Sequence, residues 1–417
     1  MKIAIYGTSR SGKDYLIGKI VEHLHLNDVN AKHIKGSETI FNLSKKKYGQ
    51  DFKSLDRSKK ETIRKGFVNI VEVISIDYDV VFVDGHYCFP FKDDFDVVFT
   101  DSDRDCYDHF FYLDTPSDII IDRFRASSEG KANFEITKNE VEKWKNYEKL
   151  HLQIVCNELN KELIILDDNI ESCQEFMSSW IQDFDLRYNY EKITRNIVEK
   201  ITQSTSIKSA SKVFLLDCDK TIAINDVTYD FCTELGINGL TLKNIFKGDR
   251  YSSYQFHRVR DLYRSFKAID VDLAFTEAER KIKYCHNLLQ EISKHKDAVV
   301  IGITSGVFEV WDRSIASSQA AHQLYGNQVL GDQKYFVTPI FKKLFARSLI
   351  EKGFDVTAVG DSLIDIPMLE AAHNGYIVAH EKINKAVSNY FHINKETRVK
   401  QIFGDKHLYN IRQAKRI

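Results

Sequence analysis

Short hydrophobic runs alternate along this chain with longer segments in which hydrophobic residues recur every three or four positions. The short runs predict buried strands, and the longer periodic segments predict amphipathic helices. The strands predicted in this way are residues 2–6, 80–84, 109–113, 163–166, 213–216, 298–303 and 356–359. Helices are expected at residues 59–75, 138–159 and 170–202. Alternation of this kind is typical of an α/β fold with parallel sheets.

One stretch interrupts this alternation. Residues 202–212, TQSTSIKSASK, are rich in Ser and Thr and poor in hydrophobic residues, which is typical of a linker. A chain of 417 residues is also longer than one hydrophobic core usually serves. We therefore expect two α/β domains, residues 1–203 and 204–417, each a parallel sheet with flanking helices. Within the second, residues 222–297 have helical patterns and few strand signals, so they are expected to form a helical insertion.

The composition is that of an ordinary globular protein, with 43% hydrophobic and 29% charged residues. The formal net charge of −1 gives no overall sign of binding to nucleic acid or an anionic membrane, although a local basic groove can hide in a balanced total. The seven cysteines contain no CxxC pair, which indicates reduced thiols. No run reaches the ~18–20 apolar residues of a membrane span, and no signal segment is evident. We expect a cytoplasmic protein.

The strand at 213–216 runs directly into Asp217-Cys218-Asp219-Lys220-Thr221. The carboxyl ends of parallel strands are where such folds place ligands. Two carboxylates two positions apart can then face one pocket, where one attacks phosphorus and the other transfers a proton.

Two later strands end in similar chemistry. The strand at 298–303 leads into Thr304-Ser305-Gly306, whose hydroxyl and backbone N–H groups suit phosphate oxygens. The strand at 356–359 leads into Gly360-Asp361-Ser362-Leu363-Ile364-Asp365, which adds carboxylates suited to Mg²⁺. A lysine of the preceding helix, Lys342 or Lys343, can neutralise the charge. We prefer Lys342, because Phe345 and Leu349 then follow it on the buried face.

These motifs resemble those of the haloacid dehalogenase (HAD) superfamily. The matches are Asp217, Asp219 and Thr221 to DxDxT, Ser305, Gly306 and Phe308 to SGxF, and Gly360, Asp361 and Asp365 to GDxxxD. The resemblance implies an HAD Rossmann-like fold, with Asp217 as nucleophile, Asp219 as general acid and base, and Ser305 as a phosphate ligand. Mg²⁺ would be held by Asp217, Asp219 and Asp361, and Asp365 would hold the metal or anchor its loop. Residues 222–297 resemble the helical cap of phosphoserine-phosphatase-like members.

A second phosphate site is predicted near the N-terminus. The strand at 2–6 is followed by Gly7-Thr8-Ser9-Arg10-Ser11-Gly12-Lys13-Asp14 and then a helical pattern. This is GxxxxGK in its required context, in which backbone N–H groups, a helix N-terminus and the lysine bind phosphates. Gly7, Ser11, Gly12 and Lys13 would bind ATP. Asp14 replaces the usual hydroxyl residue, and its carboxylate can still ligate Mg²⁺.

Further features resemble P-loop kinases of the nucleoside-monophosphate-kinase-like type. Asp84 ends a strand as a Walker-B-like carboxylate, and Arg123 and Arg125 follow a later strand, where arginines stabilise a transferred phosphoryl group. Glu38 is a candidate base for the acceptor hydroxyl. The resemblance implies a P-loop kinase fold for the first domain.

Three functions follow from these motifs. The first is a bifunctional enzyme, an ATP-dependent kinase of a small molecule or nucleotide joined to a Mg²⁺-dependent phosphatase. The second is a polynucleotide 5′-kinase/3′-phosphatase, which the balanced charge and the large cap disfavour. In the third, a nucleotide-binding but non-catalytic P-loop domain regulates the phosphatase. The expected partner is a small phosphorylated metabolite or a nucleotide.

Overall fold

The computed structural model describes residues 1–91, 94–127, 136–204, 210–247, 250–380, 384–393, 397–403 and 415–416. The chain divides into two compact units, Met1–Gln182 and Asp183–Ile417. The expected boundary lies after residue 203, but α8 (Tyr190–Gln203) packs on α15 (Pro339–Glu351) in the second unit. Thr194 and Ser348 join these two helices, with 3.3 Å between their hydroxyl oxygens.

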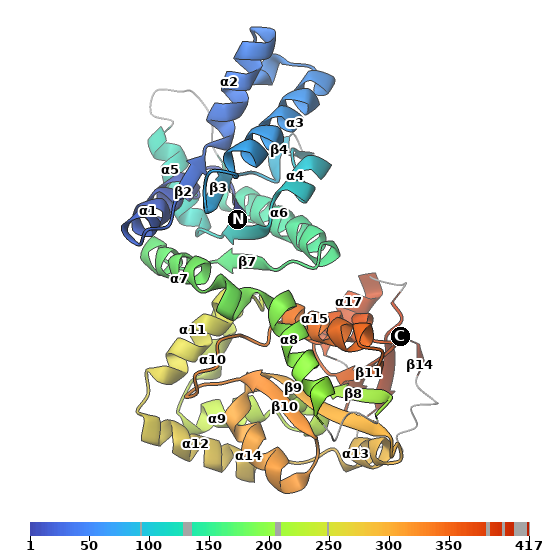
Figure 1. The fold of residues 1–417 in the computed structure, drawn as a ribbon. Helices are drawn as coiled ribbons and strands as arrows, with labels where there is room; N and C mark the ends of the chain where they lie inside the picture. The colour runs from blue at the N-terminus through green and yellow to red at the C-terminus, as the bar shows by residue number, and fades with distance from the viewer. Residues whose placement is uncertain are drawn as a thin grey trace. The chain divides into compact units, whose positions relative to one another are not determined.

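The first unit is built on a five-stranded parallel sheet (Figure 1). Its strands lie in the order β2 (Ala31–Ile34), β3 (Val80–Asp84), β1 (Lys2–Tyr6), β6 (His109–Leu113), β7 (Leu163–Leu166). The helices of this unit are α1 (Lys13–Leu26), α2 (Gly36–Tyr48), α3 (Arg57–Ile74), α4 (Asp101–Cys106), α5 (Ser117–Ser127), α6 (Lys138–Glu158) and α7 (Ile170–Gln182). A short hairpin, β4 (Cys88–Phe91) and β5 (Asp94–Val97), stands apart from the sheet. The strands at 2–6, 80–84, 109–113 and 163–166 are confirmed.

The second unit has a seven-stranded sheet. Its order is β10 (Gln323–Asn327), β9 (Ala298–Val307), β8 (Lys212–Leu216), β11 (Asp355–Gly360), β12 (Asn374–Ala379), β13 (Lys400–Phe403), β14 (Lys415–Arg416). All pairs are parallel except β13 with β14. The core helices are α8, α14 (Phe308–Ser318), α15, α16 (Ile366–Ala371) and α17 (Lys385–Ile393). The prediction of parallel sheets flanked by helices is therefore confirmed for both units.

Between β8 and β9 the described residues form helices and no strand of the main sheet. These are α9 (Val227–Glu234), α10 (Gly239–Ile245), α11 (Ser253–Arg264), α12 (Ala268–Arg280) and α13 (His286–Ser293). Their apolar faces join the hydrophobic core through residues such as Phe231, Tyr263 and Phe275. None of the described helices combines the length and hydrophobicity that crossing a bilayer requires.

In each sheet the strand order reverses beside the first strand, between β1 and β6 in one unit and between β8 and β11 in the other. Loops leave the sheet in opposite directions at such a point and open a crevice, which is where α/β folds place ligands. Both predicted phosphate sites lie at these positions. The loop 7–12 follows β1, and Asp217 follows β8.

Candidate active site

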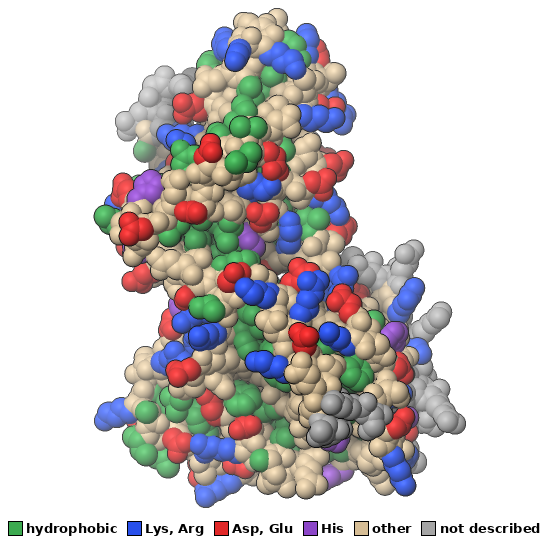
Figure 2. Space-filling model, in the orientation of Figure 1, with side chains coloured by type: hydrophobic (Ala, Val, Ile, Leu, Met, Phe, Trp, Pro, Cys, Tyr) green, Lys and Arg blue, Asp and Glu red, His purple; other side chains and the backbone are tan. Residues whose placement is uncertain are grey.

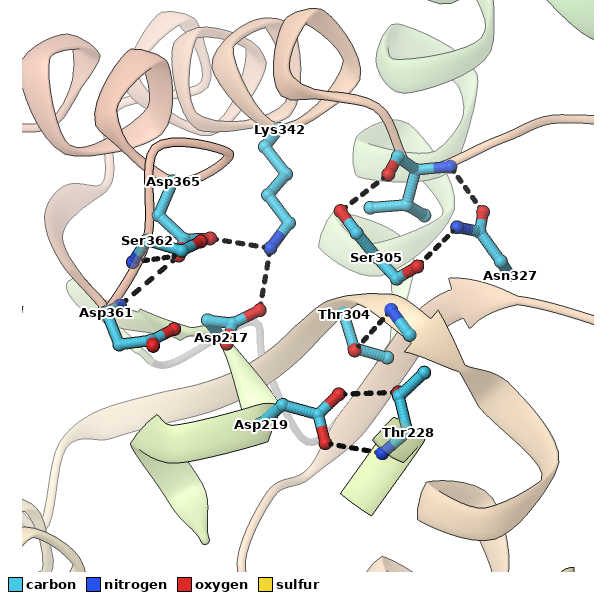
Figure 3. A network of polar contacts seen from close by, with 12 residues as sticks. Asp217, Asp219, Thr228, Thr304, Ser305, Asn327, Lys342, Asp361, Ser362 and Asp365 are labelled. Carbon is cyan, nitrogen blue, oxygen red and sulfur yellow. Dashed lines mark hydrogen bonds and ion pairs between the residues drawn. The ribbon is translucent and has the colours of Figure 1, made fainter. Parts of the chain in front are cut away.

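Four charged side chains of the second unit converge at the carboxyl edge of its sheet (Figure 3). Asp217 and Asp361 follow the adjacent strands β8 and β11, and Asp365 starts α16. Ligand oxygens of these three carboxylates all lie within 4.8 Å of one another. Lys342 reaches them from α15, where its Nζ lies 2.7 Å from both Asp217 Oδ1 and Asp365 Oδ1. Residues of two separate sequence motifs, DxDxT and GDxxxD, and the preferred lysine thus meet at one point.

Lys342 lies on the buried face of α15 because the helix places it in a hydrophobic stripe with Phe341, Phe345 and Leu349. Thr338 caps the first turn by accepting a hydrogen bond from the Phe341 amide. Burial alone would lower the pKa of Lys342, but Asp217 and Asp365 outweigh it and raise that pKa. Lys342 is therefore charged at neutral pH.

Asp365 organises the neighbouring loop. Its Oδ2 accepts hydrogen bonds from the Asp361 amide at 3.2 Å, the Ser362 amide at 3.1 Å and the Ser362 hydroxyl at 2.7 Å. Its other oxygen accepts from Lys342, so both oxygens are already occupied. A Cβ at Gly360 would clash with the Asp365 side chain, which makes glycine necessary at this position.

Asp217 and Asp361 carry the charge that remains unbalanced. Burial, followed by the neighbouring Asp365, raises the pKa of Asp217 well above its usual value. Burial, followed by the charges of Asp217 and then Asp365, also raises the pKa of Asp361 well above its usual value. One lysine facing three carboxylates leaves a net negative pocket. A hard divalent cation with oxygen ligands fits such a donor set.

Asp219 is held apart from this group. Its Oδ1 accepts hydrogen bonds from the amides of Val227 (2.7 Å) and Thr228 (3.1 Å), and its Oδ2 accepts from the Thr228 hydroxyl at 2.8 Å. These donors belong to the first turn of α9. Burial, followed by the charge of Asp226, raises the pKa of Asp219 to about 6. A carboxyl group with this pKa can both donate and accept a proton near neutral pH.

Gly306 allows the carboxyl end of β9 to approach Asp219. A Cβ at this position would clash with the Thr228 hydroxyl and the Asp219 carboxylate. Nearby, the Ser305 hydroxyl donates to the Val337 carbonyl at 2.7 Å. Asn327 ties the same segments together, because its amide donates to the Ser305 carbonyl and its oxygen accepts from the Val337 amide. The end of β9 around Ser305 is therefore held by both Val337 and Asn327.

Two of the predicted residues, Thr221 and Lys343, make no direct contact described above. Thr221 is fully buried. Lys343 has Arg347 and Glu370 as charged neighbours, whereas the ammonium that reaches Asp217 and Asp365 is that of Lys342. Motif reasoning did not identify Thr228, Asn327 or Ser362, which hold the reacting loops in place. Asn327 and Ser362 lie at strand ends and Thr228 lies at a helix start, where Asx, Ser and Thr residues are too common to single these three out.

The loop 7–12 of the first unit turns on Gly12, whose φ of 99° is one that side chains disfavour. Lys13 begins α1 and is buried, with its ammonium donating to the carbonyls of Gly7 at 2.7 Å and Thr8 at 3.1 Å. Burial lowers the pKa of Lys13. The hydroxyls of Thr8 and Ser11 are buried without a hydrogen-bond partner among the described residues. The loop thus turns several polar groups inward.

Asp14, His33 and Asp84 offer ligand atoms within 4.8 Å of one another beside this loop. Asp84 ends β3, and its Oδ1 lies 3.0 Å from His33 Nε2 and accepts a bond from the Gly36 amide. Sequence reasoning proposed Asp14 and Asp84 but missed His33.

The two arginines predicted to bind ATP, Arg123 and Arg125, lie in different surroundings. Arg123 donates to the carbonyls of Arg10 and Ser11, so it contacts the loop 7–12 directly. Arg125 is exposed and lies 3.6 Å from Asp122 on its own helix. Glu38 is exposed on the first turn of α2. The structure therefore brings Arg123, but not Arg125, to the predicted ATP site.

Comparison with known proteins adds structural neighbours only. No protein-family profile and no curated protein matches the chain. Several of the solved neighbours are HAD-family proteins, among them phosphoserine phosphatases. An HAD family hydrolase from Salmonella enterica serovar Typhi is 15% identical, over 50% of this chain and 76% of that one, with a TM-score of 0.37. A phosphoserine phosphatase with a phospho-aspartyl intermediate analogue is 19% identical, over 46% and 92%, with a TM-score of 0.36. A sugar kinase from a Janibacter species is 12% identical, over 43% and 94%, with a TM-score of 0.28. These scores are too low to assign this chain to a family.

Proposed function

We propose that the second unit is a Mg²⁺-dependent phosphomonoesterase of the HAD type that works through an aspartyl-phosphate on Asp217. The supporting observation is the convergence of Asp217, Asp361, Asp365 and Lys342 at one strand edge, with the carboxylate oxygens within 4.8 Å. Nucleophilic phosphoryl transfer requires a carboxylate that attacks phosphorus, a cation beside it and a separate carboxyl group that transfers a proton. Asp217, Lys342 and Asp219 can supply these three groups.

Asp217 and Asp361 would hold Mg²⁺, because Asp365 already uses both oxygens on Lys342 and its own loop. Asp219 was expected as a further ligand. Since its carboxylate accepts three bonds from the start of α9, we assign its side chain to proton transfer instead. When bound, the cation offsets negative charge on the two carboxylates and on the phosphoryl group.

In the first step, an oxygen of Asp217 attacks phosphorus and the bond to the leaving-group oxygen breaks. Asp219, protonated, donates its proton to that oxygen. In the second step, a water molecule attacks phosphorus and gives its proton to the Asp219 carboxylate. The bond to Asp217 breaks, phosphate leaves, and both aspartates return to their starting states. Lys342 would neutralise the phosphoryl oxygens, and Ser305 would position them once its hydroxyl turns from the Val337 carbonyl to the phosphate.

The substrate class we propose is a small phosphorylated metabolite or nucleotide. The helices α9–α13 follow the DxDxT loop directly, and α9 itself holds Asp219. A helical insertion so close to the reacting groups favours a compact leaving group.

Hydrolysis of p-nitrophenyl phosphate by the full chain tests this function. We expect Mg²⁺ to be required and Asp217→Asn to lose at least about 10³-fold in rate, because the nucleophile is removed. Asp355→Asn is a matched control, since Asp355 lies at the opposite end of β11 and is exposed. Equal rates for wild type and Asp217→Asn would reject the assignment.

As a second activity, we propose that the first unit binds ATP and transfers its γ-phosphoryl group. The favouring observations are the inward-turned loop 7–12, the buried Lys13 and the contact of Arg123 with that loop. Asp14, His33 and Asp84 would hold Mg²⁺ there. The protein would then be bifunctional.

Calorimetric titration with MgATP tests nucleotide binding. Lys13→Met should abolish it, whereas Lys19→Met, an exposed change on the same helix, should not. Equal binding by both variants would reject the site. Labelled ATP offered with metabolites or with a 5′-hydroxyl oligonucleotide then separates metabolite kinase from end repair. ATP that is not consumed but alters the phosphatase rate would indicate a regulatory role.

A further inference from the structure

The turn between α2 and α3 carries a concentration of positive charge that the whole-chain total conceals. Residues 41–65 contain nine Lys and Arg and three Asp and Glu, a local charge of +6 in a chain whose net charge is −1. The segment covers the end of α2, the short helix Phe52–Ser54 and the start of α3. Figure 1 shows where α2 and α3 meet at this tip, and Figure 2 shows Lys and Arg side chains over it. We call this surface the α2–α3 tip.

The acidic residues of the α2–α3 tip neutralise only part of its positive charge. Each of the three has one basic partner, and the ion pairs are Lys45–Asp51, Lys59–Asp56 and Arg57–Glu61. No ion pair within the described part of the chain involves the remaining six cations, which are Lys46, Lys47, Lys53, Lys60, Arg64 and Lys65. Four of these, Lys46, Lys47, Lys53 and Lys65, are exposed. Helix surfaces normally mix both signs, because unbalanced like charges repel.

Aromatic rings lie among these cations. The ammonium groups of Lys47 and Lys59 lie 5.8 and 5.7 Å from the Tyr48 ring centre. Arg64 lies 5.6 Å from the Phe52 ring, and Lys45 lies 5.5 Å from the Phe41 ring. Phe41 is 46% exposed, so its ring can be reached by a ligand. Cations interleaved with an accessible ring suit a phosphate backbone with unpaired bases.

We propose that the α2–α3 tip binds single-stranded nucleic acid through its phosphate backbone, with Phe41 stacking on a base. An anionic membrane is disfavoured, since the apolar residues Ile63, Phe67 and Val71 of α3 are buried in the unit and leave no apolar stripe to insert. The helix pair α2 and α3 starts at the ligand edge of the sheet, because the Gly36 amide at the start of α2 donates to Asp84, which ends β3. Thirteen residues of α2 span about 20 Å, so a bound strand could run toward the loop 7–12.

Fluorescence anisotropy with a labelled single-stranded 20-mer and the full chain tests this inference without metal or nucleotide. Contact with six phosphates predicts a log–log salt slope of about −4, or roughly a 300-fold loss of affinity between 50 and 200 mM salt. Lys46→Gln, Lys47→Gln and Lys53→Gln together should halve the slope to about −2. The control carries Lys267→Gln, Lys296→Gln and Lys352→Gln, three exposed lysines of the second unit outside the described ion pairs, and should match wild type.

Phe41→Ala separates stacking from charge. It should weaken single-strand binding by roughly 5-fold or more and leave the salt slope unchanged. The inference is overturned if the triple variant of the tip keeps the wild-type affinity and slope. It is equally overturned if the control loses as much, or if vesicles of anionic lipid bind while the oligonucleotide does not. None of these outcomes depends on the phosphatase or kinase proposals.

Discussion

Replacing Asp365 by asparagine tests whether this residue holds the catalytic loops rather than the metal. The carboxylate joins Lys342 on one side and three donors of the Asp361–Ser362 segment on the other. An asparagine cannot serve both sides, because one of its two polar atoms is itself a donor. Whichever way the amide is oriented, either Lys342 or the loop loses its acceptor.

The expected loss can be worked out from these contacts. Removing one partner of a buried ion pair costs about 3–5 kcal/mol. Lys342 keeps Asp217 at 2.7 Å, which limits the loss to the lower part of that range. We therefore expect Asp365→Asn to lower the free energy of unfolding of the second unit by about 3 kcal/mol. Because the Asp361 loop loosens, half-maximal activity should need 10–100-fold more Mg²⁺, an order of magnitude typical of residues that orient metal ligands.

Urea unfolding in EDTA measures the first quantity, and a Mg²⁺ titration of p-nitrophenyl phosphate hydrolysis measures the second. Asp361→Asn is the informative counterpart, because burial and the neighbouring Asp217 and Asp365 raise the pKa of Asp361. Removing that charge should stabilise the metal-free unit while activity falls. If Asp365→Asn unfolds like wild type, or if both variants change stability in the same direction, the division between anchor and ligand is refuted.

Three further outcomes follow from the structure. Gly306→Ala should reduce phosphatase activity by at least about 100-fold with the fold retained by circular dichroism, because the new Cβ would displace Thr228 and Asp219. Thr228→Val removes a hydrogen bond that lowers the pKa of Asp219, so the descending limb of kcat/KM against pH should move to higher pH. Burial raises the pKa of Glu148 from 4.5 to about 7, so the folded first unit binds the extra proton and should lose about 3 kcal/mol as pH rises from about 4.5 to 7. Chemical denaturation of Glu148→Gln should show no such decline.

The strand ends of the sequence alone predict where much of the candidate site lies. Asp217 and Asp361 come directly after hydrophobic runs, and adjacent parallel strands necessarily end at the same edge of a sheet. The choice of Lys342 over Lys343 followed from helical periodicity, and Lys342 is indeed 1% exposed on the buried face of α15. The catalytic roles of these residues remain predictions, but their proximity is observed.

Other features depend on contacts that no local pattern encodes. Thr228 meets Asp219, and Asn327 meets Ser305 and Val337, only because separate segments fold together. Strands β10, β12 and β13 were not predicted, since QLYGN and KQIF are short and NGYIVA begins with two turn-forming residues. The Ser- and Thr-rich stretch predicted an irregular segment, part of which, residues 205–209, lies outside the described residues. It could not show that α8 packs on the second unit.

The net charge of the whole chain conceals how unevenly its charged residues are distributed. A net charge of −1 argued against a nucleic-acid partner, yet that total combines a +6 segment of 25 residues with −7 over the remainder. Electrostatic attraction acts within a screening length of about 8–10 Å, so a ligand at the α2–α3 tip responds to the local surface and not to the total. Whether the chain acts on a polymer or only on small molecules therefore depends on where its charges lie, which the salt slope of the wild type and the triple variant measures.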